Sequence, residues 1–491
     1  VMLSGVDPLL TETDDRPLPL GYRIVRNFLR FLLFIFFHDI SHAGNPPPNE
    51  PILVAGNHPN GLVDGAVLLT SVRRVVSFLA KAPLFRQPVV GSMLRAAQAV
   101  PVARRQDARP GETVDNSGLF SAVRDLLCAR GCLGIFPEGI SHAESEIQEL
   151  KTGVARMAVD AAHARGAPVY IVPCGLNYFQ GHKFRGSVFV HFGEAIAVND
   201  GDSVDEIMRE LDRGLRAVTL NAPNWNVMRL CHAARRLYLP RGQTWSPAQY
   251  VAITRKFLTA YLELQDEEGI GPLRQDLQLY QDDLDRLGIT DHVVASHADV
   301  PTCLAVVVTR SFILLLLLPV TLPGLLLNLP VVAIAKLAAN RFSATQGRDV
   351  IMTYKVLIAF VFTPVLHLVY IAVIVVVAAQ HSTLLLLLIL ALPCSTLMSV
   401  YFVDMWKPTW RSLKFFCNAI SAGPQLTRLQ RSRQRLVEEV RREVGEYNRR
   451  HSIPPTHLDD NIQDVATPSP GVFDAITDPK LFRLWSATLD R

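Results

Sequence analysis

The chain has 491 residues, of which 49% are hydrophobic and only 19% are charged, and its mean hydropathy is +0.21. A soluble domain usually carries about a quarter charged residues, and the apolar excess here lies between residues 304 and 403. This composition excludes a wholly soluble protein. The net charge of +4 is too small for this length to indicate nucleic-acid binding, although it suits contact with an anionic membrane surface.

The seven cysteines are odd in number and scattered along the chain. This pattern is typical of reduced thiols on the cytosolic side of a membrane rather than of a disulfide framework. Cys128 and Cys132 lie on one predicted helix, but neither a histidine nor a second cysteine pair accompanies them. We therefore expect no zinc site.

The N-terminal part contains a short apolar segment. Residues 1–23 are polar, acidic and proline-containing, and they predict a flexible N-terminus without a cleavable signal peptide. The segment IVRNFLRFLLFIFFHDI has an uninterrupted apolar core of about ten residues, whereas a bilayer-spanning helix needs about 20. With Arg26 and Arg30 on its leading turns, residues 24–42 are predicted to form an interfacial anchor helix, and a buried core helix is the alternative.

Strands and helices alternate over residues 43–222. Short apolar runs predict strands at residues 51–56, 75–79, 99–102, 133–136, 169–173 and 188–192. Between and after these runs, helices are predicted at residues 84–97, 117–129, 152–164 and 204–220. The alternation indicates a layered α/β domain with a mixed sheet flanked by helices.

The remaining chain is predicted to be helical and partly embedded in a membrane. Residues 223–300 have charged faces and no catalytic constellation, and they predict a helical insert. Residues 301–404 form the predicted membrane region, in which residues 356–379 and 384–403 are long enough to span. Prolines 319, 323 and 330 interrupt residues 304–338, which predict a re-entrant hairpin or two spans.

Basic residues indicate the topology of this region. Lysines and arginines gather at residues 336–355 and 407–414, and the turn at residues 380–383 has none. The positive-inside rule places both basic segments in the cytosol and the turn outside. This topology requires residues 304–338 to enter and leave on one side. Residues 405–491 are predicted to form a cytosolic helix and a flexible tail, and a packed surface helix is favoured over a coiled coil.

The first chemically suggestive segment is AGNHPNGLVDG, residues 55–65. His58 directly follows a predicted strand, where α/β folds place ligand-facing loops. The turn-forming residues after it predict that the next helix begins beyond Gly61, with Asp64 in its first turn. The carboxylate can then fold back onto the imidazole, orient it and stabilise its charged form while it removes a proton from a hydroxyl. A histidine and an aspartate so spaced are, taken alone, more often structural.

The missing third member of a catalytic triad is informative. The chain has no G-x-S-x-G nucleophile elbow and no cysteine in a comparable setting. The hydroxyl that loses its proton would therefore belong to the substrate, and the transfer would proceed without an acyl-enzyme.

Two further segments carry basic residues suited to phosphate. AVPVARRQD, residues 99–107, ends a strand with Arg104 and Arg105, whose guanidinium groups donate paired hydrogen bonds. The loop between the strands of residues 169–193 forms a possible basic rim for coenzyme A phosphates, with Asn177, His182, Lys183 and Arg185. A solvated strand end and a solvated loop are the alternatives.

The remaining segment is LGIFPEGISHAESE, residues 133–146, in which a buried strand runs into a tight turn. Gly139 allows the backbone to approach a ligand closely. The Glu138 carboxylate can accept hydrogen bonds from the hydroxyls of an acceptor substrate, or it can cap the turn instead.

In this order and spacing, the four segments resemble the glycerolipid acyltransferase family, which includes glycerol-3-phosphate and lysophosphatidate acyltransferases. The family's blocks are a His/Asp motif, an arginine after a strand, Phe-Pro-Glu-Gly and a Val-Pro strand end. The matching positions here are His58 and Asp64, Arg104, residues 136–139, and Val172 with Pro173.

The chain departs from the usual family pattern at two places. Five residues rather than four separate His58 from Asp64, and Ile140-Ser141-His142 replaces the frequent Thr-Arg-Ser. Both departures resemble the fungal branch, which acylates glycerol 3-phosphate and dihydroxyacetone phosphate at the first position. The segments PVARRQD, SHAESEIQELKTGVA, IVPCGLNYF, HKFR and GRDVIMTYK also resemble that branch.

The resemblance implies roles for individual residues. His58 would be the general base and Asp64 its partner. The acceptor's glycerol phosphate would contact Arg104, Glu138 and Gly139, with weaker phosphate contacts from Lys151 and Arg185. Acyl-CoA would be the co-substrate, with no metal or prosthetic group. Backbone N–H groups of the Asn60-Gly61 or Glu138-Gly139 turn would stabilise the oxyanion.

The implied location is the endoplasmic reticulum membrane with the catalytic domain in the cytosol, or the plasma membrane in a bacterium. Two other functions remain open at this stage: a lysophospholipid (lysophosphatidate) acyltransferase, and a non-catalytic lipid-binding membrane protein. A transporter would need more spans than the chain offers. The sequence does not indicate the acyl-chain preference, the physiological acceptor or the oligomeric state.

Overall fold

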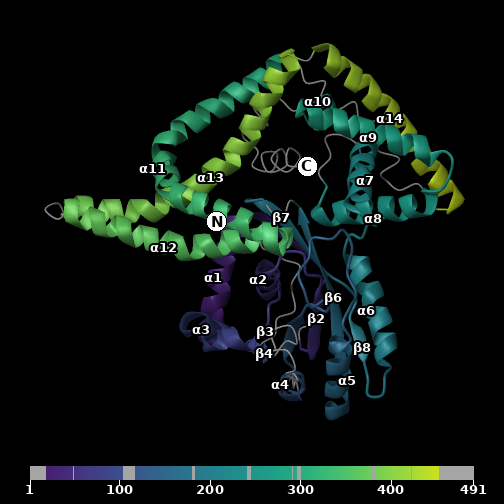
Figure 1. Cartoon of the computed structure of the whole chain (residues 1–491), viewed down its shortest axis with the longest axis vertical. Helices are drawn as coiled ribbons and strands as arrows, with labels where there is room; N and C mark the ends of the chain where they lie inside the picture. The colour runs from purple at the N-terminus through teal and green to yellow at the C-terminus, as the bar shows by residue number, and fades with distance from the viewer. Residues whose placement is uncertain are drawn as a thin grey trace. The chain divides into compact units, whose positions relative to one another are not determined.

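The computed structural model describes residues 18–47, 49–102, 117–179, 183–239, 245–289, 291–295, 300–378, 382–421 and 423–452 (Figure 1). The chain divides into two compact units. The first unit comprises Val1–Asn221 and Val331–Phe362, and the second comprises Ala222–Pro330 and Thr363–Arg491.

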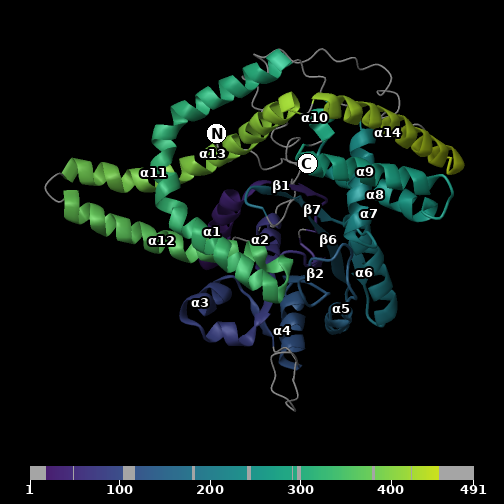
Figure 2. The same ribbon diagram turned by 45° about the horizontal axis from the view of Figure 1, so that its top comes forward.

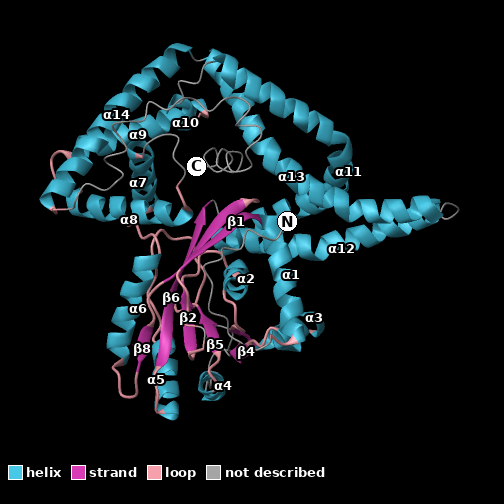
Figure 3. Cartoon of the chain, turned by 180° about the vertical axis from the view of Figure 1, so that it is seen from behind, coloured by secondary structure: helices cyan, strands magenta, loops and turns pink. Residues whose placement is uncertain are grey.

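The first unit contains a mixed sheet (Figure 3). The strands are β1 (Phe37–Ala43), β2 (Ile52–Gly56), β3 (Ser77–Lys81), β4 (Val100–Val102), β5 (Cys132–Ile135), β6 (Val169–Phe179), β7 (Gly186–Phe192) and β8 (Ile196–Val198). Their order is β1-β7-β6-β2-β5-β3-β4, and β8 pairs with β6. The central strand β2 is parallel to both of its neighbours, whereas β6 is antiparallel to β7 and β8.

Helices cover both faces of this sheet. They are α1 (Leu20–Phe36), α2 (Leu62–Ser71), α3 (Pro88–Ala96), α4 (Ser117–Cys128), α5 (Gly153–Arg165) and α6 (Val204–Val218), with a 3-10 helix at Ala82–Arg86. The period of two in β2 separates the two cores, because successive side chains of a strand point to opposite faces. Ile52 and Val54 pack with α1 and α2, whereas Leu53 and Ala55 pack with α4, α5 and α6. The predicted layered α/β fold is thus confirmed.

The sequence prediction missed two strands, β1 and β8. β1 occupies the end of the segment predicted as helix 24–42, so that prediction is wrong from Phe37 onward. A short apolar run suits either a helix or a strand. Here the parallel pairing with β7, which is distant in sequence, decides for a strand.

The second unit contains a group of packed helices. α7 (Trp225–Tyr238), α8 (Pro247–Leu264), α9 (Ile270–Leu287), the short α10 (Asp291–Ala295) and α14 (Gly423–Arg450) gather around a common apolar core (Figure 2). Within this group the buried Arg433 guanidinium pairs with Asp291, at 2.9 Å, and Tyr280 donates to the same carboxylate at 2.7 Å. The carboxylate compensates the buried charge, which unpaired would be costly.

Three long helices carry the apolar excess: α11 (Val300–Gln346), α12 (Ile351–Ala378) and α13 (Ser382–Ser421). Among the described residues, Val307–Ala344, Ile351–Val377 and Ile389–Lys407 are long and apolar enough to cross a membrane. The protein is therefore membrane-associated.

The structure corrects the prediction for residues 304–338. α11 is one continuous helix through Pro319, Pro323 and Pro330, not a hairpin. Proline is tolerated in long apolar helices where neighbouring helices and hydroxyl side chains satisfy the freed carbonyls.

Candidate active site

The loop between β2 and α2 forms the centre of the site, which we call the His58 loop (residues 57–61). Gly61 has φ +56°, a left-handed conformation that suits glycine, and α2 begins at Leu62 with Asp64 in its first turn. This geometry agrees with the prediction that the turn ends at Gly61.

The loop brings His58 and Asp64 into contact. His58 Nδ1 lies 2.8 Å from Asp64 Oδ2, and the Asp64 side chain is 0% exposed. The same oxygen accepts the Asn60 N–H at 2.7 Å, and Oδ1 accepts the Tyr178 hydroxyl at 2.6 Å. Three hydrogen bonds thus compensate the burial of this carboxylate and hold its orientation.

The hydrogen bond to Asp64 selects the tautomer of His58. A carboxylate only accepts hydrogen bonds, so Nδ1 carries the proton and Nε2 keeps its lone pair. No group in the described part of the chain is hydrogen-bonded to Nε2, and the His58 side chain is 17% exposed. The ring stacks on Phe136 with the centroids 4.2 Å apart and the planes 4° from parallel, which fixes its tilt. The imidazole can therefore accept a proton from a molecule outside the protein.

Tyr178 is a site residue that the sequence reasoning missed. It lies on β6 within the strand-end segment GLNYF and is far from Asp64 in sequence. Burial and then the negative charge of Asp64 hold the pKa of Tyr178 well above its usual value. The hydroxyl consequently stays a donor to the carboxylate. A tyrosine 114 residues away in sequence carries no local signal, because only the pairing of β6 with β2 brings it close.

Glu138 supports the His58 loop from the turn after β5. Its side chain is buried, Oε1 accepts the His58 N–H at 2.9 Å, and Oε2 accepts the Gln148 N–H at 2.9 Å and the His142 ring. The sequence left two roles open for this carboxylate, acceptor binding and turn capping. The hydrogen bonds make it a positioning residue for His58, and its role in acceptor binding stays a prediction.

His142 contacts the same carboxylate from the other side of the turn. Its Nε2 is paired with Glu138 Oε2, and its backbone N–H donates to the His58 carbonyl at 3.1 Å. Burial lowers the pKa of His142, but the hydrogen bond to Glu138 and the charges of Glu138, Glu144 and Asp349 outweigh it, and the pKa lies above its usual value. A positive imidazolium thus balances the buried Glu138 carboxylate.

Gly139 and Lys151 lie together beside this turn. Gly139 has φ +74°, and a Cβ at this position would collide with the Lys151 side chain. The Lys151 backbone N–H donates to the Pro137 carbonyl at 2.8 Å, so the ammonium group is held over the turn. The structure brings together His58, Asp64, Glu138, Gly139 and Lys151.

A segment remote in sequence also contacts the His58 loop. Between α11 and α12, the buried Asp349 carboxylate accepts the Ser141 hydroxyl at 2.5 Å. One turn later, Thr353 Oγ1 accepts the Leu62 N–H at 3.1 Å and donates to the Asn60 carbonyl at 3.3 Å. Met352, fully buried between these residues, packs into the core with α2. The beginning of an apolar helix is thus part of the site's framework, which the sequence reasoning did not anticipate.

Arg185 and Arg104 are the two arginines that the sequence predicts as phosphate ligands. The Arg185 guanidinium is buried and donates to the carbonyls of Phe34, at 2.5 Å, and Phe37, at 2.6 Å, at the end of α1. This bonding accounts for Arg185 as a helix-terminal contact, so its predicted role as a phosphate ligand has no support here. Arg104 lies outside the described residues, as does His182.

Exposed apolar side chains border the site. Leu62 follows Gly61 and is 61% exposed, and Ile140 follows Gly139 and is 49% exposed. The outer face of α1 is also apolar, with Leu20, Ile24, Phe31 and Phe34 exposed. Phe28 on α1 contacts Phe360 on α12, with ring centroids 5.0 Å apart. This arrangement suits a site that lies against the apolar part of a bilayer.

Two family models match the chain. The model described as Acyltransferase matches residues 38–177, which contain the His58 loop, and the fold and dyad agree with it. The chain thus carries an acyltransferase domain. The model described as Glycerol-3-phosphate acyltransferase 2 C-terminal domain matches residues 230–450, which include most of the predicted helical insert and membrane region. Both models agree with the resemblance of the sequence to the glycerolipid acyltransferases.

Its curated relatives are fungal. Glycerol-3-phosphate O-acyltransferase 2 of Saccharomyces cerevisiae is 31% identical over 284 residues, covering 53% of this chain and 38% of the yeast protein. Glycerol-3-phosphate O-acyltransferase 1 of the same yeast is 25% identical, and the alignment covers 85% of this chain and 70% of the yeast protein. An uncharacterized acyltransferase of Schizosaccharomyces pombe is 26% identical, and the alignment covers 70% of this chain and 66% of that protein. The chain thus spans less than two fifths of the first of these relatives.

One solved structure is also similar. The 1-acyl-sn-glycerophosphate acyltransferase of Thermotoga maritima is 20% identical with a TM-score of 0.33, covering 40% of this chain and 78% of the bacterial protein.

Proposed function

We propose that the protein transfers a fatty acyl group from acyl-CoA to a hydroxyl of glycerol 3-phosphate and so forms lysophosphatidate. The single observation that carries the proposal is the His58–Asp64 pair, in which a buried carboxylate fixes Nδ1–H and leaves Nε2 without a partner in the described part of the chain. The names of the yeast relatives support glycerol 3-phosphate as the acceptor. Dihydroxyacetone phosphate, with an equivalent hydroxyl and phosphate, is a further acceptor.

The proposed chemistry is direct transfer. His58 Nε2 removes the proton of the acceptor hydroxyl as its oxygen attacks the thioester carbonyl. Asp64 stabilises the imidazolium that forms, and Tyr178 and the Asn60 N–H keep Asp64 in place. The tetrahedral intermediate then collapses, the carbon–sulfur bond breaks, and the coenzyme A thiolate leaves and takes up a proton. The thioester provides the driving force, so the reaction needs no metal or prosthetic group.

The oxyanion of the intermediate needs backbone donors. The Asn60 N–H is engaged with Asp64, and the Gly139 N–H with the Phe136 carbonyl. Of the four predicted donors, the N–H groups of Gly61 and Glu138 therefore remain the candidates.

The acceptor phosphate requires cationic contacts. Lys151, held over Gly139, is the described residue best suited to this role. Arg104 stays a predicted phosphate ligand from the sequence motif.

We further propose that the protein lies in the endoplasmic reticulum membrane with the acyltransferase domain in the cytosol. Acyl-CoA is a cytosolic amphiphile, and the exposed Leu62 and Ile140 beside the His58 loop suit an acyl chain that approaches along the bilayer. The basic segments at residues 336–355 and 407–414 favour this orientation.

The test is an acyl-transfer assay with labelled palmitoyl-CoA and purified protein. We expect conversion of glycerol 3-phosphate to the monoacyl product, and a loss of about 100-fold or more in kcat for His58→Ala, the range expected when a general base is removed. His163→Ala is the control, because the exposed His163 pairs with Asp200 on the surface. Full activity of His58→Ala would refute the mechanism, and acylation of lysophosphatidate instead would reassign the acceptor.

A further inference from the structure

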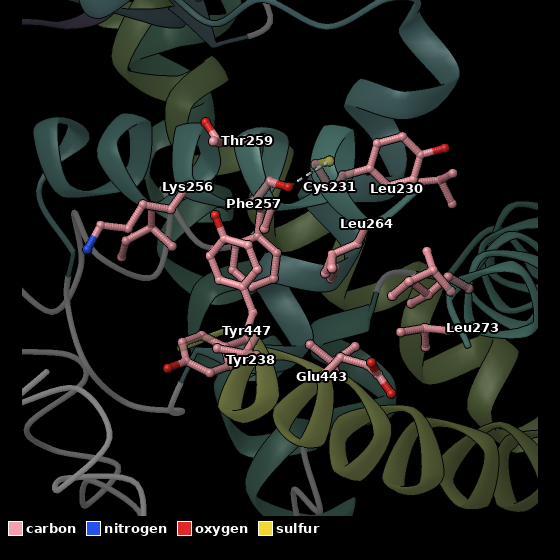
Figure 4. Close-up of a pocket in the computed structure, with 18 of the residues that line it drawn as sticks. Leu230, Cys231, Tyr238, Lys256, Phe257, Thr259, Leu264, Leu273, Glu443 and Tyr447 are labelled. Atoms are coloured by element: carbon pink, nitrogen blue, oxygen red, sulfur yellow. Dashed lines mark hydrogen bonds between the residues drawn. The ribbon is translucent and has the colours of Figure 1, made fainter. Parts of the chain in front are cut away.

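The helices of the second unit enclose a cavity of about 540 Å³. Figure 4 shows side chains from several helices projecting into it, among them Phe257, Leu264 and Tyr447. The lining comes from α7, α8, α9 and α14 and is mostly aliphatic or aromatic, with Leu230, Phe257, Leu264, Leu273, Leu277 and Val444 among its residues. A volume of this size lies in the range of small-molecule sites.

The charged groups of the lining are mostly cationic. They are Arg255, Lys256, Arg274 and Glu443. The one acidic member, Glu443, is already paired with Arg442 at 2.9 Å. Any polar ligand head group at this wall therefore meets excess positive charge.

Arg255 is the most informative of these residues. Its Nε and Nη2 are buried and have no hydrogen-bond partner among the residues that the structure describes. Burial alone accounts for the lowered pKa of Arg255, since no carboxylate contributes. Unpaired nitrogens of a half-buried guanidinium are unfavourable, and a carboxylate or phosphate can satisfy such a group with paired hydrogen bonds.

We propose that this cavity binds a single long acyl chain with an anionic head group, whose head group contacts Arg255. The apolar walls would contact the acyl chain, and the Arg255 guanidinium would form hydrogen bonds with the anionic head group. A fatty acid and a lysophosphatidate share this chemistry. The site lies in the second unit, whereas the His58 loop lies in the first, so this is a lipid site additional to the acyl-transfer site.

The test is photolabelling of the full chain in detergent with a diazirine analogue of palmitate, followed by peptide mass spectrometry. We expect labelled peptides from residues 252–264, 270–277 and 440–448. Arg255→Met keeps an unbranched apolar stem and removes the guanidinium, and we expect it to lower the labelling about tenfold, as for the loss of a charged hydrogen bond. Leu273→Trp fills the cavity and should have the same effect. Arg286→Met, at an exposed arginine paired with Asp283, is the control.

Competition identifies the head group. Excess palmitate or 1-palmitoyl lysophosphatidate should displace the probe, and the better competitor is the preferred ligand. Neutral 1-monopalmitoylglycerol should compete at least tenfold less well. Labelling that neither Arg255→Met nor Leu273→Trp reduces, or that falls only on residues 300–421, would overturn the proposal.

Lipid binding in the cavity can be tested separately from acyl transfer at the His58 loop. The photolabelling is repeated with His58→Ala, which should label as well as the wild type because the cavity does not include the His58 loop. Unfolding temperatures of Arg255→Met and Leu273→Trp within a few degrees of the wild type show that a loss of labelling is not a loss of fold.

Discussion

Tyr178 illustrates how much a single side chain outside the motif contributes to the dyad. Its hydroxyl is one of three donors to a carboxylate without solvent contact. Removing one donor from a buried charge costs about 1.5–3 kcal/mol. The lost hydrogen bond affects Asp64, which must stabilise the His58 imidazolium during transfer. The loss therefore slows the chemical step.

Tyr178→Phe should accordingly lower kcat about tenfold, with little change in KM for glycerol 3-phosphate. Steady-state kinetics of the purified variant checks this. The matched control is Tyr170→Phe, on the same strand but without contact to Asp64. Equal kcat values for the two variants would show that the Tyr178 hydroxyl does not act through the dyad.

His142 makes the stability of the site depend on pH. Its pKa is raised in the folded protein, so its protonated form stabilises the fold at pH values below the ordinary histidine pKa of about 6.5. This contribution is lost as the pH rises through the higher folded-state pKa. We expect the wild type to exceed His142→Gln by about 1–2 kcal/mol at pH 5.5 and by less at pH 8.5.

Thermal unfolding of both proteins across this pH range measures the difference. A gap in the unfolding temperature that stays constant, or widens with rising pH, would contradict the assigned charge pairing of His142 with Glu138.

At the scale of the element, the beginning of α12 is joined to the His58 loop by Thr353. The hydroxyl bonds to both sides of the turn, at the Asn60 carbonyl and the Leu62 N–H. Gly61 lies between them, and a Cβ there would stand 2.8 Å from Thr353 Oγ1. The helix therefore helps to set the position of His58.

Thr353→Val keeps the shape and removes both hydrogen bonds. We expect kcat to fall about five- to tenfold, since each bond is worth about 1 kcal/mol and part of the loss falls on loop position. Thr363→Val, further along α12, is the control. A change in KM alone would indicate that Thr353 affects substrate access rather than the position of His58.

Gly324 governs a contact between two apolar helices. A Cβ at this position would collide with the Ser395 carbonyl of α13, so the absence of a side chain permits the close approach. Gly324→Ala should lower the unfolding temperature in detergent. Gly445 lies inside α14 with no atom near its Cβ position, so Gly445→Ala should instead stabilise by about 1 kcal/mol. Equal shifts in the two variants would contradict the close contact.

At the scale of the whole molecule, the contacts of Asp349 and Thr353 bear on topology. They hold the turn between α11 and α12 on the same side of the bilayer as the acyltransferase domain. No candidate span occurs among the described residues before Val307. The charge pattern predicts that both ends of α11 lie on that side, whereas a continuous helix long enough to span predicts that they lie on opposite sides.

Inserted glycosylation acceptors test this topology. An acceptor inserted near residue 381 should be glycosylated in microsomes, and acceptors inserted near residues 298 and 347 should not. Glycosylation at residue 347 would show that α11 crosses the membrane once and that its contact with the His58 loop does not form there.

The features that could be predicted from the sequence are those set by local interactions along the chain. The short apolar run of β2 predicted a strand, Pro59, Asn60 and Gly61 predicted the turn, and the position of Asp64 in the first turn of the next helix predicted the dyad. Uninterrupted apolar runs predicted the membrane helices. Each of these features depends on residues that are neighbours in the chain.

Only the tertiary structure decided the surroundings of the dyad. Tyr178 reaches Asp64 because β6 pairs with β2, and Thr353 reaches the His58 loop because Met352 packs into the same core as α2. Arg185 is used by the end of α1, and Glu138 holds the His58 loop. Residue type indicates which hydrogen bonds a side chain can form, but the partner it meets depends on packing between segments far apart in the chain.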